Sequence, residues 1–265
     1  MRQPEMGCPD EKHKMRFLLL LVSVAAFGQP AKFEPPRQGD GHPDLQGVWR
    51  NASIVAAFNV EGQKAYYNEP GGASVIVDPP DGKLPYLAGA LQKANDNHVH
   101  RERDPTGHCH MHGVPRSLVP PFPTEIVEDS SYVVLLSETE HSVRIIPLDG
   151  RPHLKNYHAW AGDSRGHWEG DTLVVDVTGF NGKTWLDQSG NFVDEKEQVV
   201  ERFTMTGPDT IVYEARVEDP TVYSRSWTLR VSLRRQPKGT ELIEYDCIEG
   251  ERDEIHFPGA ANQKR

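Results

Sequence analysis

Residues 225–235 read RSWTLRVSLRR, and this stretch decides the fold. Apolar and polar residues alternate along it: one face carries Trp227, Leu229, Val231 and Leu233, and the other carries Arg230, Ser232 and Arg234. A repeat of two residues is typical of a β-strand that packs one face against a core and turns the other to solvent. The stretch therefore predicts a strand in a half-buried sheet.

The same period of two recurs upstream, and turn residues separate the segments that carry it. We expect strands within residues 124–138 (one bent strand or a pair), 142–150, 167–180 and 199–219, after a short strand over 44–49. Gly, Pro and Asp mark turns at 169–171, 207–209 and 237–239, and the last of these predicts a hairpin over 224–249. Apolar residues at helical spacing predict one helix, over 87–97.

Strands that follow one another through short turns form a meander. The sequence therefore predicts an all-β fold, an antiparallel up-and-down meander that closes into a barrel or folds as a sandwich, with one short helix before residue 100. The early Gly47-x-Trp49, followed by this meander, resembles the lipocalin-type barrels. That resemblance implies a barrel with a tryptophan at its closed end and a small apolar ligand at its open end.

The N-terminal part of the sequence is typical of an exported protein. An apolar run at 17–27 follows basic residues and ends in small residues, which is the layout of a signal peptide beginning at Met1 or Met15. An uncleaved anchor is the alternative, although the run is short for a membrane span. We expect a signal peptide at 1–28, a flexible lead-in at 29–42, a single β-barrel domain at 43–257 and a disordered tail at 258–265, in a periplasmic or secreted protein.

Charge limits the partners that the chain can take. The sequence holds 39 Asp and Glu against 29 Lys and Arg, a net charge of −10. Binding to nucleic acid or to an anionic membrane surface requires a basic face, so both partners are disfavoured. We expect a small-molecule ligand or substrate, and no stable membrane insertion after cleavage; the sequence assigns no oligomeric state.

Several motifs together resemble a large family of secreted bacterial proteins, most of them uncharacterised. They are IVDPPDGKLPY (76–86), GVPR (113–116), RIIPLDGRPH (144–153), GHWEGDTLVVDVTGF (166–180), ERF (201–203) and EDPTVYSRSWT (218–228). The resemblance covers nearly the whole mature chain and implies kinship and export. This chain departs from the family at residues 109–112, which read CHMH where relatives commonly have a Cys-Leu-Pro type of sequence.

Cysteine number supports a disulfide. Removal of a signal peptide would remove Cys8 and leave Cys109 and Cys247. An even pair in an exported protein predicts a Cys109–Cys247 disulfide, and two buried thiols are the alternative.

Residues 98–112 read HVHRERDPTGHCHMH and hold five of the chain's twelve histidines. In extended backbone alternate histidines point the same way, so imidazole pairs could bind zinc or copper. The candidate metal ligands are His98, His100, His108, His110 and His112. A solvated, charged loop is the alternative interpretation, and a disulfide at Cys109 would remove that thiol as a ligand.

A second cluster lies at residues 151–171, where aromatic and titratable residues mix as they do at the mouths of ligand sites. A histidine oriented by a carboxylate can act as a general base, and the candidate catalytic residues are His153, His158 and Asp163. The candidate ligand-binding residues are Arg144, Tyr157, Trp160, Trp168 and Arg202. Structural alternatives are Trp168 as a core residue in a tight turn and Arg202 as the partner of Glu201, Glu214 or Asp176.

Three functions stay open at this point. The first is an exported β-barrel that binds a small, partly apolar molecule in its cavity. The second is a His/Asp-dependent hydrolase, lyase or isomerase on the same barrel, with or without assistance from zinc or copper. The third is a structural protein of the cell envelope. A G-x-S-x-G nucleophile around Ser164 is disfavoured, because a strand and not a helix is expected to follow it.

Overall fold

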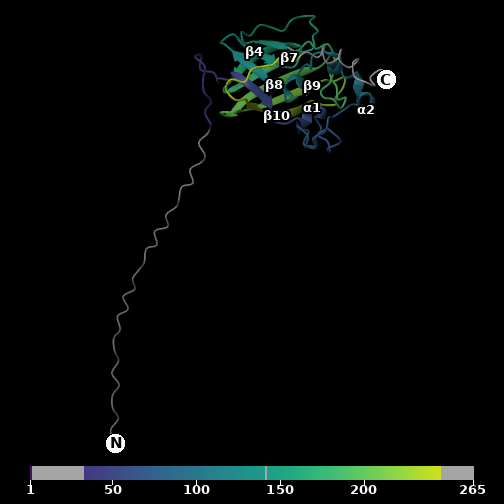
Figure 1. Cartoon of the computed structure of the whole chain (residues 1–265), viewed down its shortest axis with the longest axis horizontal. Coiled ribbons are helices and arrows are strands. Elements are labelled where there is room, and N and C mark those ends of the chain that lie inside the picture. Colours follow the sequence, from purple (N-terminus) through teal and green to yellow (C-terminus); the bar gives the residue numbers. More distant parts are fainter. Residues whose placement is uncertain (2–32, 141, 246–265) are drawn as a thin grey trace. The chain divides into compact units, whose positions relative to one another are not determined.

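The computed structural model describes residues 1, 33–140 and 142–245, and the described chain from Phe33 onward belongs to one compact unit (Figure 1). The expected signal peptide after Met1, the tail at 258–265 and Cys247 lie outside the described residues. The strands are β1 (Gly47–Asn51), β2 (Ile76–Asp78), β3 (Thr124–Glu128), β4 (Tyr132–Ser137), β5 (Val143–Pro147), β6 (Asp163–Glu169), β7 (Thr172–Thr178), β8 (Gln198–Gly207), β9 (Thr210–Glu218) and β10 (Trp227–Arg235).

The strands follow chain order around a nearly closed barrel. One antiparallel meander runs from β3 to β5 and a second from β6 to β10. Strand β1 pairs with β10 on one side and with β3 on the other, and so joins the two meanders. The order is interrupted between β5 and β6, which lie side by side without a described hydrogen-bond ladder. The predicted all-β fold is therefore confirmed.

Trp49 fixes the junction between β1 and β10. Its ring is buried, its indole Nε1 donates to the carbonyl of Leu45 at 2.8 Å, and the Arg235 guanidinium lies 4.1 Å above the ring. Gly47 has a φ of +123°, a backbone conformation that residues other than glycine rarely adopt, so glycine is favoured beside Trp49. The Gly-x-Trp pattern thus serves to join the first strand of the barrel to the last.

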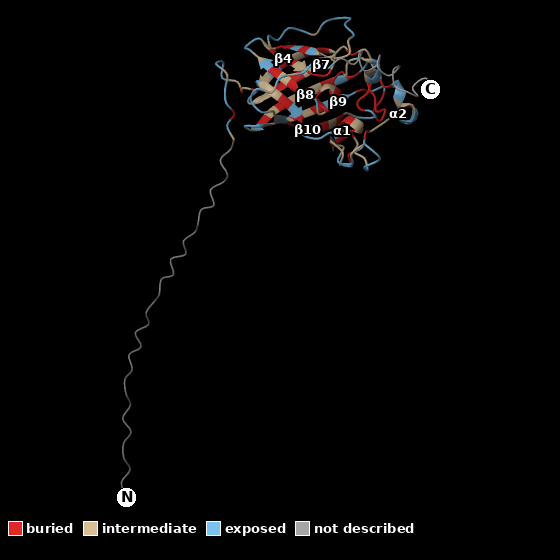
Figure 2. Cartoon of the chain, viewed as in Figure 1, coloured by how far each residue is buried: buried red, intermediate tan, exposed pale blue. Residues whose placement is uncertain are grey.

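The barrel interior is filled by the inward residues of the strands. Figure 2 shows buried residues alternating with exposed ones along the central strands. On β8 to β10 the alternation places Phe203, Tyr213 and Trp227 in the core. Burial of such large side chains contributes roughly 1.5–3 kcal/mol each, so the packed interior carries most of the stability.

The helices are short and lie outside the ladder. They are α1 (Val55–Phe58) and α2 (Ala88–Val99), followed by single 3-10 turns at Arg101–Arg103, Pro105–His108 and Arg116–Leu118. The expected helix at 87–97 agrees with α2 to within two residues. None of the helices in the described ranges is long and apolar enough to span a bilayer.

Three expectations differ from the structure. Strand β10 has no hairpin partner in residues 236–245; its outer edge pairs with β1, and the Gln236 amide donates to Val48 at 2.8 Å. The described part of the lead-in, 33–42, packs on the barrel: Arg37 pairs with Asp171 at 2.8 Å and His42 stacks on Trp168. Residues 98–108 are helical and not extended, because α2 runs through His98 and Asp104 accepts from the Thr106 amide to begin a 3-10 turn at Pro105.

Candidate functional site

The break between β5 and β6, which we call the seam, is held by side chains. Arg144 on β5 donates from Nε to the Ser164 hydroxyl on β6 at 2.8 Å, and its terminal nitrogens form a bidentate pair with buried Glu201 on β8. Tyr213 completes the cluster by donating to Glu201 at 2.8 Å. A fully hydrogen-bonded ion pair of this kind can remain charged inside a barrel, and the cluster links four strands, β5, β6, β8 and β9.

The electrostatics of the cluster favour its charged form. Burial alone would lower the pKa of Arg144, but attraction to Glu201 and the hydrogen bonds between them outweigh burial and raise it. Burial and the neighbouring Glu201 charge raise the pKa of the Tyr213 hydroxyl well above its ordinary value, so Tyr213 stays a donor. The cluster therefore keeps its hydrogen bonds over the whole physiological pH range.

Gly166 sets how closely the two edge strands approach. A Cβ at this position would lie 2.7 Å from Cδ2 of Leu148 and 2.8 Å from Cγ2 of Ile146. These apolar contacts take the place of a hydrogen-bond ladder at this level of the seam. At the Asp163 end of β6 the strands leave space instead.

That space is a groove of about 590 Å³, which we call the seam groove. Five residues predicted from the sequence line it together: Arg144, Tyr157, His158, Trp160 and Asp163. The groove also takes in Met111, Val143, Ile145 and Asn181, which were not candidate site residues, and Ser164, which was disfavoured as a nucleophile. Its volume is typical of sites for small molecules.

Asp163 and His153 form the carboxylate–imidazole pair that the sequence predicted. Nδ1 of His153 lies 3.0 Å from Oδ2 of Asp163, and the same carboxylate accepts from the Leu154 amide at 2.8 Å and from Arg165 at 2.6 Å. The contact with Asp163 fixes the orientation of the His153 imidazole and leaves its other nitrogen, Nε2, on the side away from the carboxylate. His153 itself is not among the residues that line the groove.

His158 and Trp160 occupy the wall of the groove in different ways. Nδ1 of His158 lies 3.3 Å from the carbonyl oxygen of Phe180, so this histidine is oriented by backbone and not by Asp163. The Trp160 ring stacks on His110, with ring centroids 4.7 Å apart. The histidine-rich segment therefore reaches the groove through His110 and the neighbouring Met111.

Two of the predicted ligand-binding residues, Trp168 and Arg202, do not line the seam groove. Trp168 is five residues from Asp163 along β6, about 16 Å at a strand's rise, and stacks on His42. Arg202 faces outward on β8 and pairs with Glu169 at 2.8 Å, not with Glu201, Glu214 or Asp176. Alternation along β8 explains the difference, because it turns Glu201 into the core and Arg202 out.

The five candidate metal ligands do not come together. His98 lies against Ser189, His100 against Glu102, and His112 lies 2.9 Å from Glu140, whereas His108 is bonded to the Glu102 carbonyl. Within residues 33–140 and 142–245, no three His, Cys, Asp or Glu side chains are placed to hold a metal ion. The prediction assumed one extended strand, whereas α2 and two 3-10 turns interrupt residues 98–108 and separate these side chains.

Cys109 is disulfide-bonded. Both other cysteines lie outside the described residues, so the pairing with Cys247 stays a prediction. The bond makes Cys109 unavailable as a metal ligand.

The most deeply buried polar groups gave little signal in the sequence. Glu201 was expected only as a partner of Arg202, and Glu197 and Asp187 were not expected at all.

No protein-family model and no curated protein matches this chain. A functional assignment therefore rests on the geometry of the site.

Proposed function

We propose that the protein binds a small, partly apolar molecule, and that the seam groove is its binding site. The observation that carries this proposal is the groove of about 590 Å³ that opens beside Trp160. The packed barrel interior speaks against a ligand deep in the lumen. The break in the ladder supplies the opening at the side of the barrel instead.

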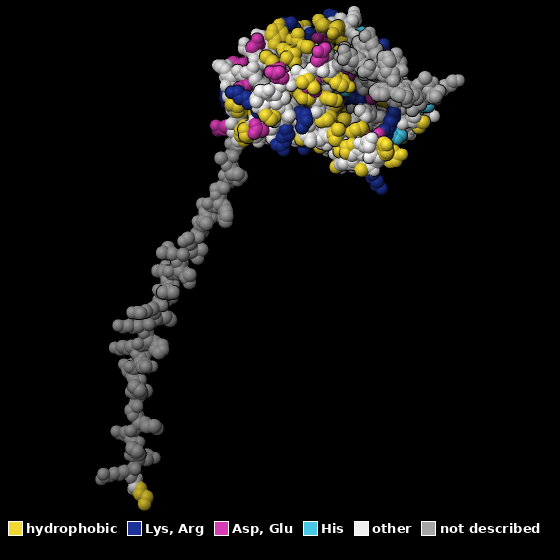
Figure 3. All heavy atoms as spheres, in the orientation of Figure 1, with side chains coloured by type: hydrophobic (Ala, Val, Ile, Leu, Met, Phe, Trp, Pro, Cys, Tyr) yellow, Lys and Arg dark blue, Asp and Glu magenta, His cyan; other side chains and the backbone are white. Residues whose placement is uncertain are grey.

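The walls of the groove support a ligand with apolar surface. Val143 is 55% exposed, Ile145 57% and Tyr157 41%, although such side chains are normally covered. In the space-filling view, hydrophobic side chains gather over the region where Figure 1 labels β4 and β7 (Figure 3). An apolar ligand that covered these residues would gain roughly 25 cal/mol per Å² of buried apolar area.

The polar groups of the groove would orient a bound ligand rather than attract an oppositely charged one. Arg144 lines the groove, but its donors are taken by Ser164 and Glu201. Asn181 and His158 add polar groups to the lining. These groups fit a ligand with one or two polar functions on an apolar body.

We also propose that the protein acts outside the cytoplasm. Structural disulfides persist in oxidising compartments, and the bond at Cys109 supports export to the periplasm or the medium.

A second candidate function is catalysis by His153, favoured by its contact with Asp163. A histidine held by a carboxylate can act as a general base in hydrolysis, elimination or isomerisation. Binding is the better-supported function, because His153 does not line the groove where a ligand would lie.

A thermal-shift screen of the mature protein with indole, geraniol and decanoate tests the proposal. A ligand at about 100-fold its Kd should raise Tm by about 5 °C or more. Trp160→Ala should abolish that shift, whereas Trp168→Ala, on the same barrel but outside the groove, should keep it. Equal loss in both variants, or no shift with any probe, would contradict binding in the groove.

A further inference from the structure

A second cavity, of about 580 Å³, lies beside α2, and we call it the helix cleft. It shares no lining residue with the seam groove. Five parts of the chain line it: the loop after α1, the turn at 83–86, α2, the loop at 187–191, and Ser224. Loops that converge in this way on a rigid body often build a small-molecule site.

A buried carboxylate organises the loops behind the cleft. Asp187 accepts from the amides of Val60 at 2.8 Å and Ser189 at 2.9 Å, and from the side chain of Asn191 at 2.7 Å. Burial raises the pKa of Asp187 to about 6 against the opposing effect of these hydrogen bonds, so the group is ionised at neutral pH. The side chain of Asn191 is thereby fixed in the cleft wall.

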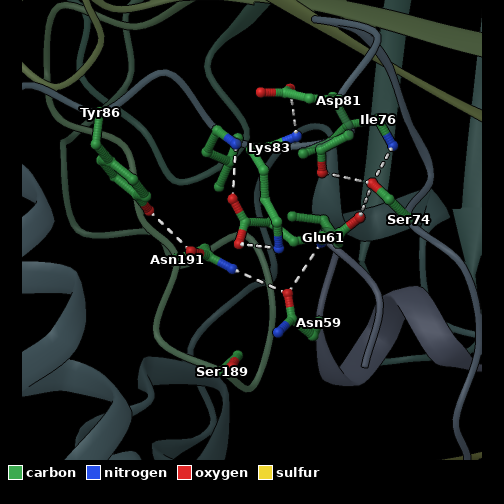
Figure 4. Close-up of polar contacts among 12 residues, drawn as sticks. Asn59, Glu61, Ser74, Ile76, Asp81, Lys83, Tyr86, Ser189 and Asn191 are labelled. Carbon is green, nitrogen blue, oxygen red and sulfur yellow. Dashed lines mark hydrogen bonds and ion pairs between the residues drawn. The ribbon is translucent and has the colours of Figure 1, made fainter. Parts of the chain in front are cut away.

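The wall offers both donors and acceptors. Figure 4 shows a row of hydrogen bonds that runs from Tyr86 through Asn191 to Asn59. Oδ1 of Asn59 accepts from the Glu61 amide at 2.9 Å and from Asn191, whereas Nδ2 of Asn59 has no partner among the described residues. Nδ2 of Asn59 is thus a donor held in place for a ligand.

Acceptors come from the opposite side. Nδ1 of His98 lies 3.1 Å from the Ser189 carbonyl, which can only accept, so Nδ1 is the donor and Nε2 is the ring nitrogen left to accept from a ligand. Glu61 lies 3.4 Å from Lys83, so the negative and positive charges of the lining offset each other. The cleft is therefore polar without net charge.

Apolar surface completes the lining. Leu84, Leu91 and Ala94 all border the cleft beside the polar groups. Pyranose rings combine hydroxyls, which both donate and accept, with faces of C–H groups that pack on apolar side chains. Anionic or cationic ligands would meet no excess of opposite charge here.

We propose that the helix cleft binds a neutral carbohydrate, a short saccharide or a sugar unit of a larger glycan. Asn59 Nδ2 donates to a sugar hydroxyl, and His98 Nε2 accepts from another. The C–H face packs on Leu84 and Leu91. This site is independent of the seam groove and of the ligand proposed for it.

NMR titration of the full-length mature protein with cellobiose, maltose and N,N′-diacetylchitobiose tests this proposal. At least one of the three should bind saturably, with shifts confined to cleft residues. Asn95→Leu removes a cleft amide from α2, and Gln92→Leu makes the same kind of change on α2 outside the cleft. Asn59→Asp keeps the acceptor for Glu61 and removes the free donor.

Asn95→Leu and Asn59→Asp should weaken binding by about tenfold, as expected for loss of one or two ligand hydrogen bonds. Gln92→Leu and Trp160→Ala should leave the affinity unchanged. Absence of saturable binding by all three sugars overturns the proposal, and so does equal weakening by Asn95→Leu and Gln92→Leu. Equal affinity for digalacturonate, which is anionic, would overturn the assignment to a neutral ligand.

Discussion

Glu197 is the least compensated acidic residue of the described core. It is 2% exposed, and neither of its carboxyl oxygens has a hydrogen-bond partner within residues 33–140 and 142–245. Burial, and then the charges of Asp219 and Glu201, raise its pKa well above the ordinary value, so the folded protein holds Glu197 in its neutral form. The unfolded chain ionises this group near its ordinary pKa of about 4.3. Folding stability is thus lost as pH rises above that value and up to the pKa of the folded state.

Glu197→Gln should flatten this dependence. Glutamine stays neutral at every pH, so the variant should be more stable than the parent at pH 7 and should lose less stability between pH 6 and 8. Urea denaturation at a series of pH values measures the difference. Glu195→Gln, at an exposed neighbouring position, should keep the parent slope; an unchanged slope in Glu197→Gln would show that the group is ionised in the folded state.

Asp187 contrasts with Glu197, because backbone and side-chain donors surround it. Asp187→Asn would place an NH₂ group against at least one of these donors. We expect a loss of about 2–4 kcal/mol in the free energy of unfolding at pH 7, together with loosening of the helix cleft. Chemical denaturation checks the value, with exposed Asp209→Asn as the control at about 0.5 kcal/mol or less.

At the level of elements, the seam depends on the missing side chain of Gly166. Gly166→Ala would press a methyl group on Leu148 and Ile146 and force β5 away from β6. We expect a loss of about 1–3 kcal/mol in unfolding free energy. Leu148→Ala in the same chain should recover part of that loss, which a double-mutant cycle would measure. Additive losses would mean that the two side chains do not meet.

The strands could be predicted because their local pattern agrees with their environment. Residues 227–235 alternate and face a core on one side, and the turn at Gly170 joins β6 to β7 as expected. The predicted hairpin at 224–249 failed because β10 pairs with β1, far away in the chain: Asn51 is opposite Leu233 and Trp49 is opposite Arg235. A local pattern identifies a strand but not its long-range partner.

The candidate site could be predicted from the sequence only where its residues are close to one another in the chain. Tyr157, His158, Trp160 and Asp163 are close in sequence and fall together in the seam groove. Arg144 and Ser164 meet across the seam, and the residues of the helix cleft come from five parts of the chain, so no local pattern relates them. The prediction for the histidine-rich segment failed because its spacing was interpreted for a strand, whereas α2 and 3-10 turns interrupt the segment.

At the level of the whole molecule, the disulfide at Cys109 is a covalent restraint on the chain. Reduction should lower the free energy of unfolding by about 2–4 kcal/mol, because the unfolded chain regains conformational freedom. Unfolding with and without a phosphine reductant measures this effect, and Cys109→Ser should not respond to the reductant. Peptide mapping under non-reducing conditions would identify Cys247 as the partner; a Cys8 linkage would contradict the predicted pairing.

The pairing of β1 with β10 would allow the strands to be connected in a different order along the chain. Gln236 hydrogen-bonds to Val48, so the start of β1 and the end of β10 already lie next to each other. Between β5 and β6 no ladder would be cut. A circular permutant that begins at β6 and runs through a linker from β10 to β1 would retain every strand pairing of the native barrel, with its new termini at the mouth of the seam groove.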